Sequence, residues 1–244
     1  MKKISTTAVV LAGALVSSSV SAEQIWSDFN IAYLDGSDHE LGDGNRQVIT
    51  FEHASGHDWG DTFFFMDRSM SDNGTNETYF ELQPRLSLSY LTGSDLSFGP
   101  VKDVYLASQW ESKSDSNGGF DNYMAGVGVS LDVPGFQFFK ANLYQVSNDT
   151  KKSDMQLTLG WGAPFEIGNA EFLYDGFIDL TSSEDEANHA TEMNFTSQLK
   201  WNVGKAMGTK KPVYVGVEYA YWNNKFGVEG VDERSPSLLL KVHF

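Results

Sequence analysis

The chain has 244 residues and a formal net charge of −16 at neutral pH, with 33 acidic against 17 basic side chains. This acidity argues against nucleic acid as a partner, because phosphate contacts need clustered Lys and Arg. Aromatic residues make up 14% of the chain, whereas disordered chains are poor in them. There are no cysteines, so a fold must be stable without disulfides.

The first 22 residues predict a secretory signal peptide. Lys2 and Lys3 precede an apolar run at 8–16, and small residues at 20–22 offer a cleavage site. We expect residues 1–22 to be removed and residues 23–244 to form the mature protein. No later apolar run approaches the roughly 20 residues that a membrane helix needs. The mature chain is therefore either soluble or crosses a bilayer as strands.

The clearest local pattern lies at 80–90, where every even position is apolar or aromatic and every odd position is polar. A period of two indicates a β-strand with one apolar and one polar face. A strand of a soluble sandwich has the same pattern. Within this strand Pro84 predicts a local bulge, because proline lacks an amide donor for the ladder.

Reading alternation and turn residues along the whole chain predicts about twelve strands. They cover 26–34, 46–54, 58–67, 80–90, 101–111, 122–133, 136–146, 155–161, 170–180, 193–203, 213–222 and 237–244. Repeated segments of about ten alternating residues predict an all-β fold, a single antiparallel transmembrane β-barrel. The final segment ends on Phe244, which resembles the assembly signal of bacterial outer-membrane barrels.

The connections differ in length and suggest an orientation. Those at 55–57 and 134–135 are short, whereas those after the first, third, ninth and eleventh strands are long and polar. We assign the short turns to the periplasm and the long loops to the exterior, with 92–100 as a longer periplasmic connection.

Side-chain parity then predicts which residues line the lumen. In the third strand Phe63 and Phe65 must point inward if Asp61 and Asp67 do, so aromatic rings lie on the wet side. The candidate lumen residues are Glu52, Asp61, Phe63, Phe65, Asp67, Glu81, Arg85, Tyr105, Asp175, Phe177 and Trp222.

Four stretches are distinctive: FELQPRLS at 80–87, LTGSDLSFGP at 91–100, DWGD at 58–61 with Asp67, and YMAGVG at 123–128. They resemble the Tsx family of nucleoside-specific outer-membrane channels and the related OmpK proteins. The resemblance runs from about 46 to 133 and is weaker beyond. It implies a narrow, monomeric, twelve-stranded barrel in the outer membrane, in contact with its lipid, that passes nucleosides and deoxynucleosides by facilitated diffusion. Several members also act as phage or colicin receptors.

The chain departs from the family in the third strand, where Phe63 and Phe65 stand in place of tyrosines. These rings keep a stacking face and lose the hydroxyl, so the substrate preference stays open.

A nucleoside has a flat base and a sugar rich in hydroxyls, so a selective channel needs aromatic faces beside hydrogen-bond acceptors. The predicted lumen contains both: aromatic rings that can stack and carboxylates that can accept from sugar hydroxyls. Arg85 either pairs with these acids or donates to a base carbonyl. The excess of inward acids disfavours nucleotides and other anions. Alternatively, the rings simply fill a small barrel.

Other functions remain as alternatives. The barrel could be non-conducting and serve mainly as a surface receptor or adhesion protein. An outer-membrane hydrolase would need a histidine with an oriented serine or acid, and we predict no catalytic residues. His53 and His57 with Asp58 and Asp61 suggest a metal site, but they straddle a turn and face different ways. We therefore predict neither a metal nor a cofactor.

Overall fold

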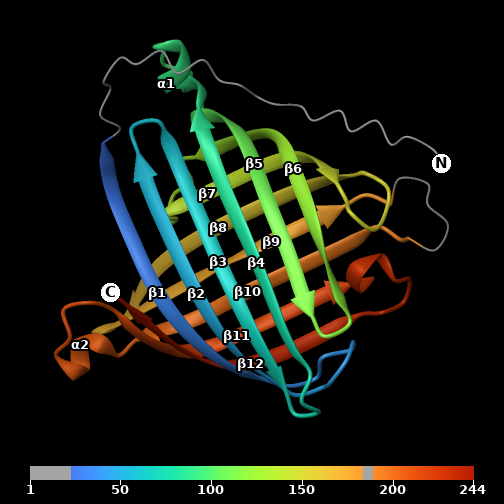
Figure 1. Cartoon of the computed structure of the whole chain (residues 1–244). Coiled ribbons are helices and arrows are strands. Elements are labelled where there is room, and N and C mark those ends of the chain that lie inside the picture. The colour runs from blue at the N-terminus through green and yellow to red at the C-terminus, as the bar shows by residue number, and fades with distance from the viewer. Residues whose placement is uncertain (1–22, 184–188) are drawn as a thin grey trace, which may run out of the picture.

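The computed structural model describes residues 23–183 and 189–244, which form one antiparallel sheet closed into a barrel of twelve strands (Figure 1). The strands are β1 (Gln24–Gly36), β2 (Arg46–His57), β3 (Gly60–Ser71), β4 (Asn76–Ser87), β5 (Val101–Asp115), β6 (Gly118–Leu131), β7 (Phe138–Ser147), β8 (Asp154–Ile167), β9 (Ala170–Thr181), β10 (Glu192–Asn202), β11 (Val213–Asn223) and β12 (Glu233–His243). Each strand pairs with its sequence neighbours, and β1 pairs with β12. The predicted fold is confirmed. The predicted signal peptide lies outside the described residues.

Side chains alternate between the outside and the inside of the barrel along each strand. In β7, Leu143 is 46% exposed, while its neighbours Asn142 and Tyr144 are 5% and 0% exposed. In β12, Leu238 and Leu240 are exposed, whereas the intervening Leu239 is buried. Large apolar side chains thus lie on the outer surface, as they do where a barrel faces hydrocarbon.

The two ends of the barrel carry different connections. We call the end where β1 begins and β12 ends the proximal end, and the opposite end the distal end. The proximal turns 58–59 and 168–169 are tight, whereas the distal segments 37–45 and 224–232 are long. Two proximal connections are longer and contain α1 (Leu88–Thr92) and α2 (Gly204–Met207). Among the described residues, no helix is both long and apolar enough to cross a membrane.

Outward-facing aromatic rings gather toward both ends of the strands. Near the proximal end the rings of Phe29 and Phe244 lie 5.8 Å apart. Toward the distal end Trp110 stacks on Tyr123 at 6.2 Å, and its Nε1 donates to Asp121 at 3.0 Å. Such girdles mark the two membrane–water interfaces of outer-membrane barrels.

The fourth strand ends earlier than its alternation predicts. β4 stops at Ser87, and the following residues form α1 instead of continuing the strand to Tyr90. The Ser87 hydroxyl accepts a hydrogen bond from the Tyr90 amide at 3.0 Å, which caps the helix. Gly93 ends it with φ of 66°, a left-handed conformation that suits glycine. The cap therefore outweighs the apolar period at this point.

Two further local predictions are wrong. The long connection predicted after the third strand shrinks to residues 72–75, because β3 and β4 both extend beyond the predicted strands. Pro84 produces no bulge, since the register of β4 on β5 is the same at Leu82 and at Arg85. Between Leu82 and Arg85, Gln83 and Pro84 lack ladder partners on β5, so the missing amide is accommodated without an extra residue.

We expect the free energy of unfolding to fall by about 2–4 kcal/mol when Leu143 is replaced by arginine, because a charge would then face hydrocarbon near the middle of a strand. Urea unfolding in lipid vesicles measures this change. The matched control is Thr196→Arg, on the inner face of β10. Equal losses in both variants would contradict the assignment of the two faces.

Candidate functional site in the barrel lumen

The structure places all of the predicted lumen residues on the inner face of the barrel. Directly opposed residues of antiparallel strands share a face, so the register extends the inward set from strand to strand. Asp61 opposes Arg85, which is only 2% exposed. Followed around the barrel, the inward set includes Glu52, Asp61, Phe63, Phe65, Asp67, Glu81, Arg85, Tyr105, Asp175, Phe177 and Trp222. Their part in solute binding stays a prediction.

Arg85 is the centre of a polar cluster between β3, β4 and β7. Its Nε and Nη2 donate to the two oxygens of Asp61 at 3.0 and 2.6 Å, which is a bidentate pair. Lys140 Nζ donates to the same carboxylate at 3.0 Å, and Arg85 Nη1 donates to Asn142 Oδ1 at 3.3 Å. The guanidinium carbon lies 4.2 Å from the ring centroid of Tyr105. Arg85 thus pairs with an acid, one of its two predicted roles.

A second cluster on β4 and β5 is rich in acids. Glu81 and Glu111 oppose each other across the two strands. The Tyr79 hydroxyl lies 2.6 Å from Glu81 Oε1 and 2.8 Å from Glu111 Oε2. The side-chain amides of Gln83 and Asn122 donate to Glu81 and Glu111, each at 2.6 Å. One hydroxyl proton therefore serves two carboxylates, and the cluster has an excess of hydrogen-bond acceptors.

Two lysines hold acids on another part of the wall. Lys200 Nζ donates to Asp175 at 2.6 Å and to Gln198 at 3.0 Å. Lys241 Nζ donates to Glu52 at 2.7 Å. Both lysine side chains are almost fully buried, while Glu52 and Asp175 remain partly exposed. Each lysine charge is neutralised by the acid beside it.

Aromatic rings form a row beside the acid-rich cluster. Phe63 and Phe65 have ring centroids 6.1 Å apart, and Phe65 lies 5.8 Å from Tyr79. Phe177 lies on another part of the wall and opposes Gly160 on β8. A Cβ atom at Gly160 would have only a backbone oxygen, at 3.9 Å, within contact distance. No side chain therefore covers the wall at Gly160, opposite Phe177.

Tyr79 and Glu111 are two lumen residues of this cluster that the candidate list left out. Tyr79 falls one residue before the predicted fourth strand, and Glu111 is the last residue of the predicted fifth. Both have the parity of Glu81 and Gln109, so following the alternation to the end of the fifth strand, and one residue before the start of the fourth, would have found them. The pairing of lysines with acids on other strands leaves no such signal, because it depends on the register and on the closure of the barrel.

The histidines do not form the suggested metal site. His53 lies on the outer face opposite Phe29, whereas Asp61 faces the lumen. The His57 ring stacks on Trp59 at 4.8 Å. In the part of the chain that the structure describes, no three metal-ligating side chains come together.

His39 approaches a serine and an acid in the order of a hydrolase triad. Its Nε2 lies 3.3 Å from Ser235 Oγ and its Nδ1 lies 3.6 Å from Glu233 Oε1. The Ser235 hydroxyl, however, donates to the carbonyl of Ser37 at 2.7 Å, and the residue is buried. These contacts fasten the segment 37–45 to β12 and leave no accessible nucleophile.

Asp43 fastens the same segment to its neighbour. Its carboxylate accepts hydrogen bonds from the backbone amides of Asn45 at 3.1 Å and Asn73 at 2.6 Å. The bond from Asn45 makes the largest contribution to lowering the pKa of Asp43, and the bond from Asn73 makes the next largest. A charged carboxylate therefore joins two distal connections.

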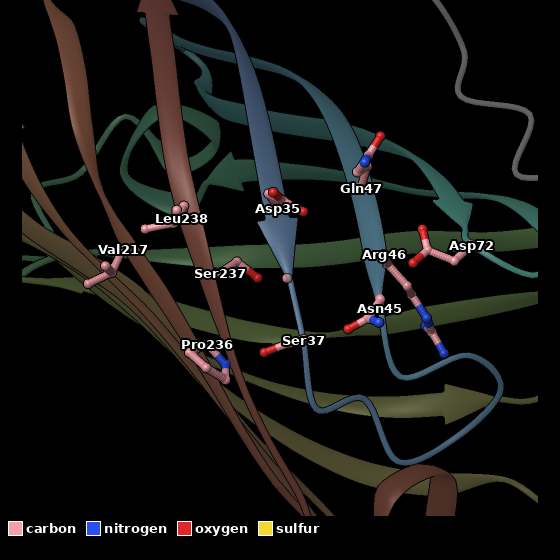
Figure 2. Close-up of a pocket in the computed structure, with 11 residues that line it drawn as sticks. Asp35, Ser37, Asn45, Arg46, Gln47, Asp72, Val217, Pro236, Ser237 and Leu238 are labelled. Atoms are coloured by element: carbon pink, nitrogen blue, oxygen red, sulfur yellow. The ribbon is translucent and has the colours of Figure 1, made fainter.

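A pocket of about 490 Å³ lies at the distal rim, between the ends of β1, β2, β11 and β12 (Figure 2). Asp35, Gln47, Val217 and Leu238 line it. The register places these four residues on the outer face of the barrel. Gly36, Arg46 and Ser237 also line it and have inward parity, so the pocket lies at the rim where the two faces of the sheet meet.

The family described as "Nucleoside-specific channel-forming protein, Tsx" matches residues 22–237. The chain belongs to this family. Together with the closed barrel, membership in the Tsx family identifies a multi-pass outer-membrane barrel of the channel-forming class.

Individual relatives match the chain over shorter stretches than the family does. The outer membrane protein OmpK of Vibrio parahaemolyticus serotype O3:K6 (strain RIMD 2210633) is 29% identical over 170 residues, or 63% of each chain. The nucleoside-specific channel-forming protein Tsx of Klebsiella pneumoniae is 25% identical over 192 residues, covering 62% of this chain and 65% of the relative. The chain thus spans less than two thirds of these relatives' lengths. Among solved structures, the KdgM porin in complex with disordered oligogalacturonate aligns over 88% of this chain and 99% of its own, with 11% identity and a TM-score of 0.48.

Replacing Tyr79 with phenylalanine should lower the free energy of unfolding by about 1–3 kcal/mol, because two opposed carboxylates would lose their shared donor. Urea unfolding in detergent micelles measures the effect. Tyr174→Phe on the outer face of β9 is the control and should leave stability nearly unchanged. If the two variants were equally stable, the hydroxyl would not hold the acid pair together.

Proposed function

We propose that this Tsx-family barrel passes nucleosides and deoxynucleosides across the outer membrane by facilitated diffusion. The observation that carries the proposal is the row of Phe63, Phe65 and Tyr79 rings, which runs beside the acceptors of Glu81 and Glu111. Ring faces suit a base, and carboxylate oxygens suit the hydroxyls of a sugar. The rings and the carboxylates are close enough for one nucleoside to contact both.

The charge balance of the lumen favours a neutral solute. Lys200 and Lys241 each contact one acid, and Arg85 and Lys140 share the carboxylate of Asp61. Glu81 and Glu111 instead bond to amides and a hydroxyl. This negative charge would repel an anion such as a nucleotide, whereas it would not repel an uncharged nucleoside.

Weak binding is sufficient for this role. Stacking contributes roughly 1–3 kcal/mol per base, and millimolar affinity needs only about 4 kcal/mol. One or two rings with a few hydrogen bonds supply that amount. A tighter site would slow release, and a channel must release what it binds.

The names of the relatives support the same function. The Klebsiella pneumoniae relative is named a nucleoside-specific channel-forming protein, which agrees with a channel rather than an enzyme. Because the match covers less than two thirds of that protein, the solute is inferred chiefly from the lumen residues of this chain.

Single-channel recording in planar bilayers tests the proposal. We expect open-channel current that adenosine or thymidine reduces, and an increase in apparent dissociation constant of about tenfold or more in Phe63→Ala/Phe65→Ala, which loses two stacking faces. Phe64→Ala is the matched control, because Phe64 lies between them on β3 and faces outward, 6.3 Å from Phe80.

Three results would count against it. Current that nucleosides do not affect would indicate a general porin, and the absence of current would favour a surface receptor. Unchanged block in the double variant would remove Phe63 and Phe65 from the binding role.

A further inference from the structure

The segment 224–232, which joins β11 to β12, folds across the distal mouth of the barrel. It contains the short 3₁₀ turn η1 (Lys225–Gly227) (Figure 1). The Phe226 ring centroid lies 6.0 Å from Lys113 Nζ, on β5. In the closed sheet β5 lies on the opposite side of the barrel from β11 and β12. The Phe226 ring therefore lies within the opening.

Backbone and side-chain hydrogen bonds fix the path of this segment. The Asn224 side-chain amide donates to the Thr191 carbonyl at 2.9 Å, and the Asn224 backbone amide donates to Asp232 at 3.0 Å. The Lys225 amide donates to the Val231 carbonyl at 2.7 Å. The turn is thus tied both to its own far end and to the start of β10.

A buried ion pair anchors the turn to the wall. Lys225 Nζ donates to Glu233 at 2.5 Å, and both side chains are almost completely buried. The ammonium group also lies 4.7 Å from the Trp222 ring centroid. Glu233 accepts the backbone amide of Glu40 at 3.0 Å, so a second distal segment shares the anchor.

The anchored turn holds Phe226 in an uncommon conformation. Phe226 has φ of 58° and ψ of 27°, in the left-handed region that large side chains rarely adopt. Such a conformation persists where the surroundings impose it, and it is frequent at binding sites. The side chain is nevertheless 47% exposed, and its ring meets Trp222 edge to face at 4.8 Å. The contacts therefore present an aromatic surface to the opening rather than bury it.

We propose that Phe226 and Trp222 form a docking site for the flat base of a solute at the distal mouth, and that 224–232 is a selectivity element on the path. This inference rests on the proposed function and adds a site ahead of the β3 rings. The Lys113–Glu77 pair, 2.8 Å apart, faces Phe226 and offers both a donor and an acceptor to a sugar. The ligand class is a neutral, planar heteroaromatic ring that carries hydroxyl groups.

The test compares Phe226→Leu, which keeps bulk but loses the ring, with Phe226→Tyr, which keeps the ring. Adenosine is added to one side of a planar bilayer at a time, and its rate of block is measured. We expect the rate from the distal side to fall about tenfold in Phe226→Leu. The rate from the proximal side should not change, and Phe226→Tyr should match the unmodified protein.

Phe98→Leu is the control, because Phe98 is exposed in the connection 88–100 at the proximal end. It should leave block from the distal side unaffected. Unaltered open-channel current in each variant shows that the barrel has assembled.

The outcomes separate the two proposals. If adenosine blocks the unmodified channel and Phe226→Leu behaves identically, the docking site is wrong and the nucleoside channel stands. If Phe226→Leu reduces block equally from both sides, the ring acts on the whole lumen and the distal role is wrong. If adenosine blocks from neither side, both proposals fail.

Discussion

The structure depends on one constraint: in hydrocarbon, a backbone N–H or C=O without a partner costs several kcal/mol, so a membrane sheet must close on itself. Pairing of β1 with β12, from Asn30 with His243 to Gly36 with Ser237, provides the closure. Once the sheet is closed, every side chain points either to lipid or to the lumen. That division makes the outer wall apolar and collects most of the strand-borne ionisable groups inside.

The inner wall carries charged groups that water alone does not solvate fully. These groups are stabilised in two ways. Arg85, Lys140, Lys200 and Lys241 are paired with acids, whereas Glu81 and Glu111 depend on a tyrosine hydroxyl and amides. Glu81 and Glu111 lie beside aromatic rings, which gives the lumen the combination that a neutral, hydroxylated ring compound would recognise.

Alternation predicts the fold well because lipid and water impose opposite requirements on successive residues. The strands, their number and the inward position of residues such as Phe63 and Asp175 follow from parity alone. Helix α1 does not, because the Ser87 cap and Gly93 are local features that override the apolar period. The ion pairs between strands also do not, since they depend on the register and on the closure of the barrel, which parity leaves open.

The mouth of the barrel is the least predictable part for a related reason. Phe226 lies in a polar loop with no periodicity. Its position depends on the left-handed conformation of two non-glycine residues, Asn224 and Phe226 itself, and on the burial of Lys225 against Glu233. Nothing in the local sequence marks a phenylalanine for a conformation that is normally adopted by glycine or asparagine. Contacts from β10 and β12 impose it.

Single-cysteine scanning along β3 tests the central division of the barrel most directly, because the chain contains no cysteine of its own. One cysteine at a time would be placed at positions 61 to 67, and its reaction with a charged, membrane-impermeant thiol reagent would be measured in lipid vesicles. Reaction at odd positions and protection at even positions is the predicted result. Reaction at even positions, or no alternation at all, would contradict a lumen lined by these residues.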